Sequence, residues 1–300
     1  MKLQDLHVFM TVVQAGGMGK AAQGLHTSQP AISRSIAGLE SVLGVRLLER
    51  TAHGVEPTEY GRALLEGGAA VFDQLQQAVR KIAHLADPTA GEVRVGSTVF
   101  TAASFVCAVI DRFSRRHPKV TFRLVTAAAE GLHRELDERK VDFLVTRRFG
   151  ANPGERLDFE PLFDEPLVVA AGIESRWARR RKIVLRDLAN ESWVLPPGES
   201  AISSIAAQAF AASGVDYPRA AVETLTPEVR MSLVVTGRFL SVFPASTVRF
   251  SDRRSEIKVL PVEFKTGRTP TGIVTLRNRS LSPVAMLFIE VAREVAKELR

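Results

Sequence analysis

The sequence predicts an α/β protein that begins with a winged helix-turn-helix, continues through one long linker helix and ends in a two-lobed α/β domain. Three observations support this prediction. A pair of short helices is indicated between residues 21 and 40, and a proline-free stretch with apolar residues at heptad spacing covers residues 59–86. Beyond residue 91, strand patterns alternate with helix patterns. We therefore expect three parts: residues 1–58, residues 59–87 and residues 91–300.

The composition is that of an ordinary soluble globular protein. The chain has 300 residues, of which 45% are hydrophobic and 24% charged, which is enough for two or three domains. Its apolar runs are too short for a bilayer, and the N-terminus lacks the pattern of a signal peptide, so we expect no membrane partner. The single cysteine, Cys107, excludes an internal disulfide and suits a cytoplasmic protein. Its apolar neighbours predict a buried structural thiol.

The net charge of +7 does not by itself indicate nucleic-acid binding. Residues 1–86 hold eight basic and seven acidic residues, so the basic excess lies in the rest of the chain. Any affinity for DNA must therefore come from the placement of individual charges and from dimerisation, not from a strongly basic domain.

The first 20 residues predict one amphipathic helix. Apolar residues recur at helical spacing over residues 3–15, where they serve the packing of a three-helix core. The glycine-rich segment of residues 16–19 ends this helix.

Residues 21–40 predict two short helices joined by a tight turn. Their apolar positions fall where two packed helices would bury them: Ala22, Leu25, Ile32, Ile36 and Leu39. Ser28 is suited to cap the second helix, and Pro30 then lies in the first turn, where its missing N–H costs little. An ordinary helical hairpin is the alternative to a DNA-reading pair.

The solvent-facing side of the second helix favours the DNA-reading alternative. Its residues are small or polar: Gln29, Ser33, Arg34 and Ala37. Such a face enters a major groove without collision, and Gln and Arg are the side chains that read adenine and guanine edges.

A wing is predicted after this helix. Residues 45–50 and 54–58 have the pattern of two short strands around a turn. Arg46 and Arg50 are placed to contact phosphate or the minor groove, and such contacts fix the register of a protein on DNA. Arg46 has the alternative role of covering the hydrophobic edge.

The linker helix carries a candidate dimer seam. Leu65, Phe72 and Val79 lie seven residues apart, and Leu75 and Ile82 form a companion series. About three heptads suffice for a dimer arm. The alternative is a helix packed on its own domain.

A turn at residues 87–91 precedes the α/β region. We expect strands over residues 92–96, 120–125, 141–145, 166–170, 192–195, 239–243 and 272–276, and helices that reach Phe113, cover 131–139 and end the chain over 281–298.

The N-terminal region closely resembles the N-terminal domain of LysR-type transcriptional regulators in residue type and spacing, and the rest of the chain resembles this family more loosely, in length and order of elements. The resemblance rests on residues 21–40, 43–50 and 57–61. Gly17 and Met18 depart from the serine and phenylalanine usual in this family, which weakens a helix cap without touching the reading surface.

This resemblance implies a regulator of transcription that binds double-stranded DNA at a dyad-symmetric site. Bases or their edges would be faced by Gln29, Pro30, Ser33 and Arg34, and the DNA backbone by Thr27, Ser28 and Arg50. The linker helix would form a homodimer, and two dimers a homotetramer.

The same resemblance implies that the C-terminal region is an effector domain of periplasmic-binding-protein type. Lobe I would comprise about residues 91–160 and 266–300, and lobe II about residues 161–265, with a small-molecule effector, an organic or aromatic acid, held between them. Many members of the family have a second glycine near the position of Phe239, in the turn Gly237-Arg238-Phe239. The bulkier side chain in this chain would narrow the cleft or repack the core.

Ligands of open α/β sheets bind beyond the carboxyl ends of strands, against helix N-termini. The polar residues at such strand ends are the candidate effector-binding residues: Ser97, Thr98, Thr101, Thr126, Thr146 and Arg147. Capping of a helix is the alternative role for the first three, and an ion pair between lobes for Arg147. Residues 196–200 and 224–227 are the loops expected to close the cleft.

No catalytic constellation is evident in the sequence. The six histidines, His53 among them, lack metal-ligand spacing, and neither a nucleophile elbow nor a phosphate-binding loop is present, so we expect no enzyme activity, metal or cofactor. A solute-binding protein, a small enzyme and a constitutive DNA-binding protein are the alternatives. The basic run of residues 176–182 predicts a solvated surface, with an accessory nucleic-acid patch as the alternative.

Overall fold

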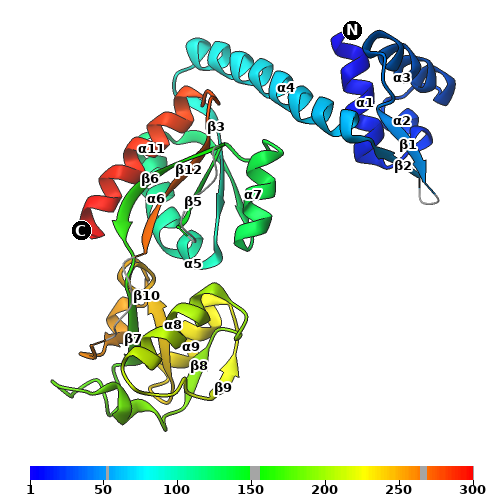
Figure 1. Ribbon diagram of the computed structural model, residues 1–300. Coiled ribbons are helices and arrows are strands. Elements are labelled where there is room, and N and C mark those ends of the chain that lie inside the picture. The colour runs from blue at the N-terminus through cyan, green and yellow to red at the C-terminus, as the bar shows by residue number, and fades with distance from the viewer. Residues whose placement is uncertain (52–53, 149–155, 264–268, 300) are drawn as a thin grey trace. The chain divides into compact units, whose positions relative to one another are not determined.

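The computed structural model describes residues 1–51, 54–148, 156–263 and 269–299 (Figure 1). The chain divides into two compact units, one from Met1 to Val79 and one from Arg80 onward.

The first unit is a three-helix head with a β-hairpin, as predicted. Its elements are α1 (Leu3–Ala15), α2 (Met18–Gly24), α3 (Gln29–Leu43), β1 (Leu48–Thr51) and β2 (Gly54–Pro57). The Ser28 side chain accepts a hydrogen bond from the backbone N–H of Ala31 at 3.3 Å, and Pro30 lies in the first turn of α3. The predicted cap is therefore confirmed.

The wing begins later than the sequence indicated. The first strand starts at Leu48, three residues beyond the expected Val45. The amides of Leu47 and Leu48 donate to Glu40 Oε1 at 2.7 and 3.3 Å, so this carboxylate holds the preceding segment out of the hairpin. At the other strand, a Cβ on Gly54 would lie 2.2 Å from the carbonyl oxygen of Gly16, so only glycine fits this approach of the wing to the α1–α2 turn.

The linker helix α4 (Glu59–Ala86) matches the predicted range. Its candidate seam is corrected by the structure, because Leu65 and Phe72 pack against the hydrophobic core of the head. The later seam residues are free of that core: Leu75, Val79 and Ile82 are 53%, 58% and 67% exposed. The exposed apolar stripe thus belongs to the second half of α4.

The second unit contains two five-stranded sheets with the same strand pattern. The first has the order β4-β3-β5-β12-β6 and the second β11-β7-β10-β8-β9. In each sheet the three strands nearest one edge are parallel and the remaining two are antiparallel to their neighbours. We call the parts built on these sheets lobe I and lobe II.

The strands of lobe I are β3 (Ala90–Ser97), β4 (Lys119–Thr126), β5 (Phe143–Arg147), β6 (Leu157–Asp164) and β12 (Pro270–Leu276). Its helices are α5 (Val99–Thr101), α6 (Cys107–Arg116), α7 (Ala129–Asp137) and α11 (Pro283–Ala296). A π-helical turn, Ala102–Val106, joins α5 to α6 in one continuous helix. In Figure 1, α6 and α11 cover one face of the sheet and α7 covers the other.

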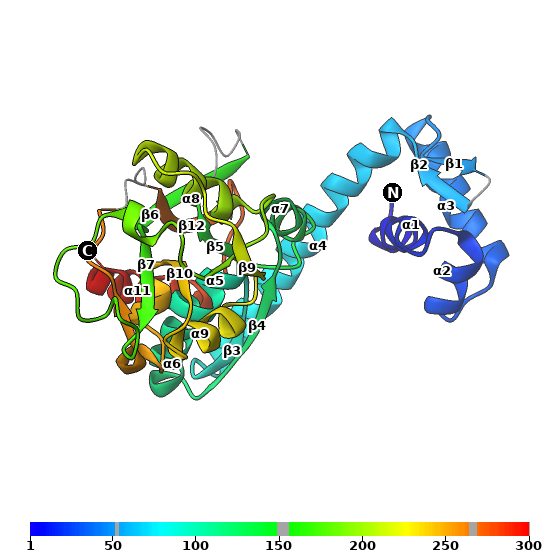
Figure 2. The ribbon, with the colours of Figure 1, turned by 90° about the horizontal axis from the view of Figure 1, so that it is seen from below.

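The strands of lobe II are β7 (Leu167–Gly172), β8 (Trp193–Leu195), β9 (Ala220–Glu223), β10 (Leu240–Pro244) and β11 (Ile257–Val259). Its helices are α8 (Ala201–Ala212), α9 (Pro227–Val235) and α10 (Ala245–Arg249). Figure 2, seen from below, brings this lobe toward the viewer. Among the elements that we did not expect from the sequence are β6, β9, β11, α8 and α9.

Four hydrophobic clusters organise the two lobes, and one of them packs α7 on the sheet of lobe I. Lobe I is centred on the rings of Phe105, Phe113, Phe143 and Phe288, and lobe II on Trp193 and Phe210. A smaller cluster joins Phe100 of lobe I to Met231 and Phe243 of lobe II. The chain leaves lobe I after Asp164, slightly later than the expected boundary near 160. The expected return at residues 265 and 266 lies outside the described residues.

Cys107 is exposed, which corrects the prediction of a buried thiol. Its neighbours Phe105, Val106 and Val109 are buried. They are one and two positions away along the chain, whereas residues on one helix face are three or four apart. Apolar sequence neighbours therefore did not indicate which face the thiol occupies. No helix among the described residues has the length and apolarity that a membrane crossing requires.

Candidate functional site

The head presents the predicted reading residues on one open surface. All seven are exposed: Thr27, Ser28, Gln29, Pro30, Ser33, Arg34 and Arg50. The opposite side of α3 is buried through Ile32, Ile36 and Leu39. This division follows from helical spacing, because the buried residues recur every three or four positions and leave the polar ones facing solvent.

The position of α3 in the head is fixed by a polar contact as well as by its core. Ser35 Oγ donates to Asp5 Oδ1 at 2.8 Å and ties α3 to α1. Among the described residues, Arg34 makes one long Nε contact of 3.4 Å with the carbonyl oxygen of Pro30, and the residue is exposed to solvent. Arg46 and Arg50 are also exposed, Arg50 on the wing strand β1.

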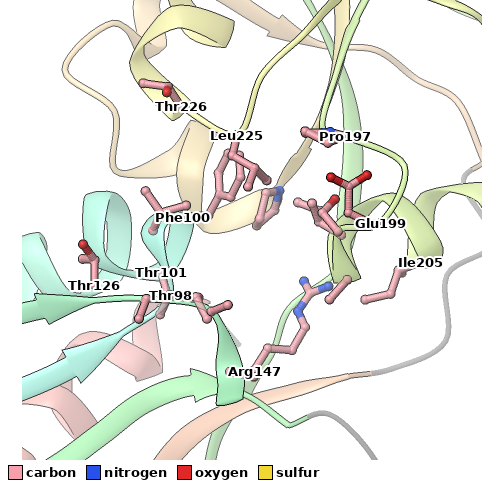
Figure 3. A pocket seen from close by; sticks show the side chains of 18 of the residues that line it. Thr98, Phe100, Thr101, Thr126, Arg147, Pro197, Glu199, Ile205, Leu225 and Thr226 are labelled. Atoms are coloured by element: carbon pink, nitrogen blue, oxygen red, sulfur yellow. The ribbon is translucent and has the colours of Figure 1, made fainter. Parts of the chain in front are cut away.

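The second unit contains a cavity of about 690 Å³ between its two lobes (Figure 3). Lobe I contributes residues 98–101, residues 126–130 and Arg147. Lobe II contributes Pro197, residues 199–202, Ile205, residues 225–226 and Pro244, and Glu165 lies at the connection between the lobes. Both loops that were expected to close the cleft therefore supply lining residues.

Four of the six candidate effector-binding residues line this cavity: Thr98, Thr101, Thr126 and Arg147. Ser97 and Thr146 do not, which corrects their assignment. Ser97 is fully buried, and its hydroxyl donates to the carbonyl oxygen of Val145 at 2.6 Å. Thr146 is buried, and its hydroxyl makes a 3.3 Å contact with the carbonyl oxygen of Arg147. The Ser97 side chain thus joins β3 to β5, the Thr146 side chain bonds within its own strand, and neither lines the cavity.

Four helices begin at the cavity wall. These are the helix that starts at Val99 and helices α7, α8 and α9. The N-cap residue of each lines the cavity: in the same order, Thr98, Ala128, Ser200 and Thr226. Only the Ser200 side chain caps its own helix, by accepting from the N–H of Ser203 at 3.2 Å. The first-turn amides of a helix carry partial positive charge and lack partners within the helix. The cavity is therefore rich in donors suited to an anion.

Arg147 adds a full positive charge to this wall. Figure 3 shows its guanidinium extending from the end of β5 into the cavity. Its Nη2 donates to the carbonyl oxygen of Glu165 at 2.6 Å, and no carboxylate of the described residues lies within ion-pair distance. Burial lowers the pKa of Arg147, and the nearby Glu165 carboxylate partly offsets this. The interlobe ion pair considered for Arg147 is thus replaced by a backbone contact at the connection between lobes.

Glu165 is held by the lobe II side of that connection. Its Oε1 and Oε2 accept from the N–H and Oγ of Ser246 at 3.0 and 2.8 Å. Ser246 Oγ also lies 3.1 Å from Ser104 Oγ in the π-helical turn of lobe I. Burial raises the pKa of the Glu165 carboxyl, although the Ser246 bonds and Arg147 act in the opposite direction. The sequence held no signal for this residue.

The rest of the wall is largely apolar. It includes Phe100, Ile202, Ile205 and Leu225 (Figure 3). Phe239 does not line the cavity; it is half-buried, and the Arg238 guanidinium lies 5.6 Å from its ring centre. The bulk of Phe239 therefore does not narrow the cleft.

The basic run of residues 176–182 lies on the surface of lobe II. Arg176 pairs with Glu191 and stacks on Trp177, and Arg179, Arg180, Arg181 and Lys182 are exposed. A group of three potential metal ligands is not found within the described ranges, and His53 lies outside them.

Two family descriptions match the chain. The description "Bacterial regulatory helix-turn-helix protein, lysR family" matches residues 3–62, and "LysR substrate binding domain" matches residues 86–297. Among curated relatives, the HTH-type transcriptional regulator GbpR of Azospirillum brasilense is 26% identical, covering 98% of this chain and 86% of its own. The RuBisCO operon transcriptional regulator of Allochromatium vinosum is 30% identical, covering 98% and 97%.

Solved structures share the fold along nearly the whole chain. A variant of full-length OxyR from Pseudomonas aeruginosa is similar with a TM-score of 0.68 and 22% identity, covering 99% of this chain and 95% of its own. CbnR, described as a LysR family transcriptional regulator, is similar with a TM-score of 0.63 and 23% identity, covering 99% of each chain.

Proposed function

Because this chain belongs to the LysR family of bacterial transcriptional regulators, we propose that a small organic or aromatic acid, bound between its lobes, switches its activity on DNA. The observation that carries this proposal is the convergence of the Arg147 guanidinium and four helix N-termini on one cavity. The same chain bears an exposed polar helix face on its head. Reading and sensing are then assigned to separate units.

We propose that α3 reads DNA in the major groove. Gln29, Pro30, Ser33 and Arg34 would face bases or their edges, and Thr27, Ser28 and Arg50 the sugar-phosphate backbone. The exposure of all seven residues supports contact with DNA, since base readout needs polar groups that are free of partners within the protein.

The exposed stripe of α4 supports a homodimer. Leu75, Val79 and Ile82 are more than half exposed and recur at helical spacing, so a second copy of the helix would cover them. Two heads on one dimer would read a dyad-symmetric site. We further propose a homotetramer of two dimers, and the functional division into residues 1–58, 59–87 and 91–300.

The chemistry of the cavity supports an anionic effector with an apolar body. Arg147 and the open amides would hold a carboxylate, and Phe100, Ile202, Ile205 and Leu225 would contact a hydrocarbon or aromatic group. Such a ligand would change DNA bending only by binding one arrangement of the subunits more tightly than another.

Titration of the purified protein against its own upstream intergenic DNA tests the DNA-reading proposal. Binding should exceed that to random DNA of equal length at each of several salt concentrations. Equal binding to both DNAs would contradict specific readout of this region.

Arg34→Ala and Arg50→Ala form a matched pair for the same assay. Arg34→Ala should weaken operator binding by about 1–3 kcal/mol more than random-DNA binding, because it removes a base contact. Arg50→Ala should weaken both about equally and reduce the salt slope by about one. Equal losses on both DNAs for Arg34→Ala would overturn its role in base readout.

Leu75→Asp tests the dimer arm by sedimentation, with Gln76→Asp as the control on the same helix. The first should lower the molecular mass in solution because it places a charge in an apolar seam, and the second should not. Unchanged mass for Leu75→Asp would refute the seam.

A further inference from the structure

The cavity wall carries more negative than positive side chains. Beside Arg147 it includes three carboxylates, Glu130, Glu165 and Glu199. Glu165 is buried, and both of its oxygens accept bonds from Ser246. Glu130 and Glu199 are exposed, and neither makes a hydrogen bond or ion pair with the described residues. A ligand that carries a positive group as well as a carboxylate would therefore meet an opposite charge for each of its own.

Arg147 and Glu199 face the same cavity without pairing with each other. No ion pair joins them, although Arg147 has no carboxylate partner and Glu199 no cationic partner among the described residues. Figure 3 shows both side chains on the cavity wall. The Arg147 guanidinium is buried, where a charge without an opposite charge beside it is costly, whereas Glu199 is exposed to solvent. Two such groups left apart are complementary to a ligand that carries both charges.

We infer that the effector is a zwitterion of the amino-acid type with an apolar side chain, its carboxylate held by Arg147 and its ammonium group by Glu199. This inference rests on the proposed function, since it assumes that the effector occupies this cavity. The α8 N-terminus, next to Glu199, offers the amides of Ala201 and Ile202 to the carboxylate. Ile202, Ile205, Phe100 and Leu225 receive the side chain. A volume of about 690 Å³ accommodates a large branched or aromatic one.

The two charged contacts come from different lobes. Arg147 ends β5 of lobe I, and Glu199 lies in the loop between β8 and α8 of lobe II. A zwitterion thus makes an ion pair with a side chain of each lobe, whereas a simple acid makes an ion pair with Arg147 alone. Glu130 lies on α7 of lobe I and does not supply this bridge.

Binding of matched small molecules to the full-length protein tests the inference. The probes are the twenty amino acids and two analogues of each apolar amino acid, one without the amino group and one without the carboxyl group. One such set is L-phenylalanine, 3-phenylpropionate and 2-phenylethylamine. Calorimetry should show at least one apolar amino acid binding about tenfold or more tightly than its acid and its amine, because each lacks one charged bond.

Glu199→Gln then separates the ammonium contact from the carboxylate contact. Affinity for the amino acid should fall about tenfold or more, and affinity for the matching acid should stay equal or rise. Glu130→Gln is the control and should change neither by more than about threefold. Arg147→Met should lose both ligands, and retained operator binding by each variant verifies that it is folded.

The outcomes distinguish this inference from the function on which it rests. The zwitterion inference is overturned if the simple acids bind wild-type protein as tightly as the amino acids, or if Glu199→Gln changes the affinity for both alike. In that case, loss of acid binding in Arg147→Met would still support an acid effector. If no amino acid binds, the inference fails. If no acid of either kind binds, the proposed class of effector fails with it, while operator titration judges the DNA-binding role separately.

Discussion

The two lobes repeat one fold but stabilise their buried arginines differently. Each places three parallel strands in the order second, first, third, and in each the helices after the first and second strands begin at the cavity. In lobe I the buried Arg94 and Arg279 lie beside a carboxylate just before β5, its third parallel strand. In lobe II the buried cation contacts β10, the corresponding strand, and has aromatic rings in place of a carboxylate. Equivalent backbones therefore do not require equivalent chemistry.

Asp142 is the counter-charge of lobe I. It is fully buried and accepts from Arg94 Nη2 at 2.7 Å and from the Arg94 backbone N–H at 2.9 Å. Arg80 Nη1, near the end of the linker helix, donates to it at 3.1 Å, and the Arg279 guanidinium lies 3.7 Å away. Three guanidinium groups thus share one carboxylate.

Arg230 has no such partner within the described parts of lobe II. It is fully buried, and its Nε and Nη2 donate to Ser241 Oγ at 3.1 and 2.8 Å. Its guanidinium carbon lies 5.0 and 4.9 Å from the ring centres of Phe100 and Phe243, where the ring faces attract a cation. Burial lowers the pKa of Arg230 to about 10, with Tyr217 acting in the opposite direction.

The largest expected effect is that of Asp142→Asn, which removes the counter-charge of lobe I and keeps its shape. Because Arg94 would remain buried without the carboxylate that its backbone N–H and guanidinium contact, we expect a loss of about 3–5 kcal/mol in the free energy of unfolding. Denaturant titration measures it. Glu92→Gln, which removes the exposed partner of Arg80, is the control and should cost at most about 1 kcal/mol. A cost for Asp142→Asn no larger than that of the control would contradict the contrast between the lobes.

Arg230→Met should be the milder change, since it removes a buried charge without stranding an opposite one. It leaves the Val242 carbonyl oxygen and Ser241 with fewer partners, although Ser241 Oγ still donates to the Val194 carbonyl oxygen at 2.5 Å. We expect a loss of about 1–3 kcal/mol in the same titration. A loss equal to that of Asp142→Asn would mean that aromatic rings stabilise a buried guanidinium as strongly as a carboxylate does.

The smallest expected effect concerns Glu165, where the two lobes meet. Its pKa is raised above the ordinary value of 4.5, so the folded protein retains a proton that the unfolded chain has released. Stability from this group is therefore present below pH 4.5 and is lost as the pH rises through the raised pKa. Glu165→Gln should flatten the decline of unfolding free energy with pH above 4.5. An unchanged slope would show that Glu165 titrates as in the unfolded chain.

Local sequence patterns were sufficient to predict the helices of the head, because the ends and the buried face of each helix are specified by neighbouring residues. The Ser28 cap and Pro30 define the start of α3, and the spacing of Ile32, Ile36 and Leu39 defines its buried side. The exposed polar residues follow directly, since a helix with one buried face leaves the other to solvent.

The residues that line the cavity could not be predicted from local sequence patterns, because they are decided by contacts between distant parts of the chain. Ser97 and Thr98 are adjacent hydroxyl residues after the same strand, yet Ser97 bonds to the neighbouring strand and Thr98 lines the cavity. Leu65 and Phe72 share the heptad spacing of Val79 but pack on the head.

The sequence by itself indicated the family, the helices of the head and linker and the exposed polar face of α3, because helical period, caps and turn residues act over a few positions. Only the tertiary structure decided which strand-end side chains face the cavity, which half of α4 is free, and that Arg147 and Glu199 lie unpaired on one wall. The physical reason is that these properties depend on how two lobes, with residues more than 50 positions apart, pack around a shared space.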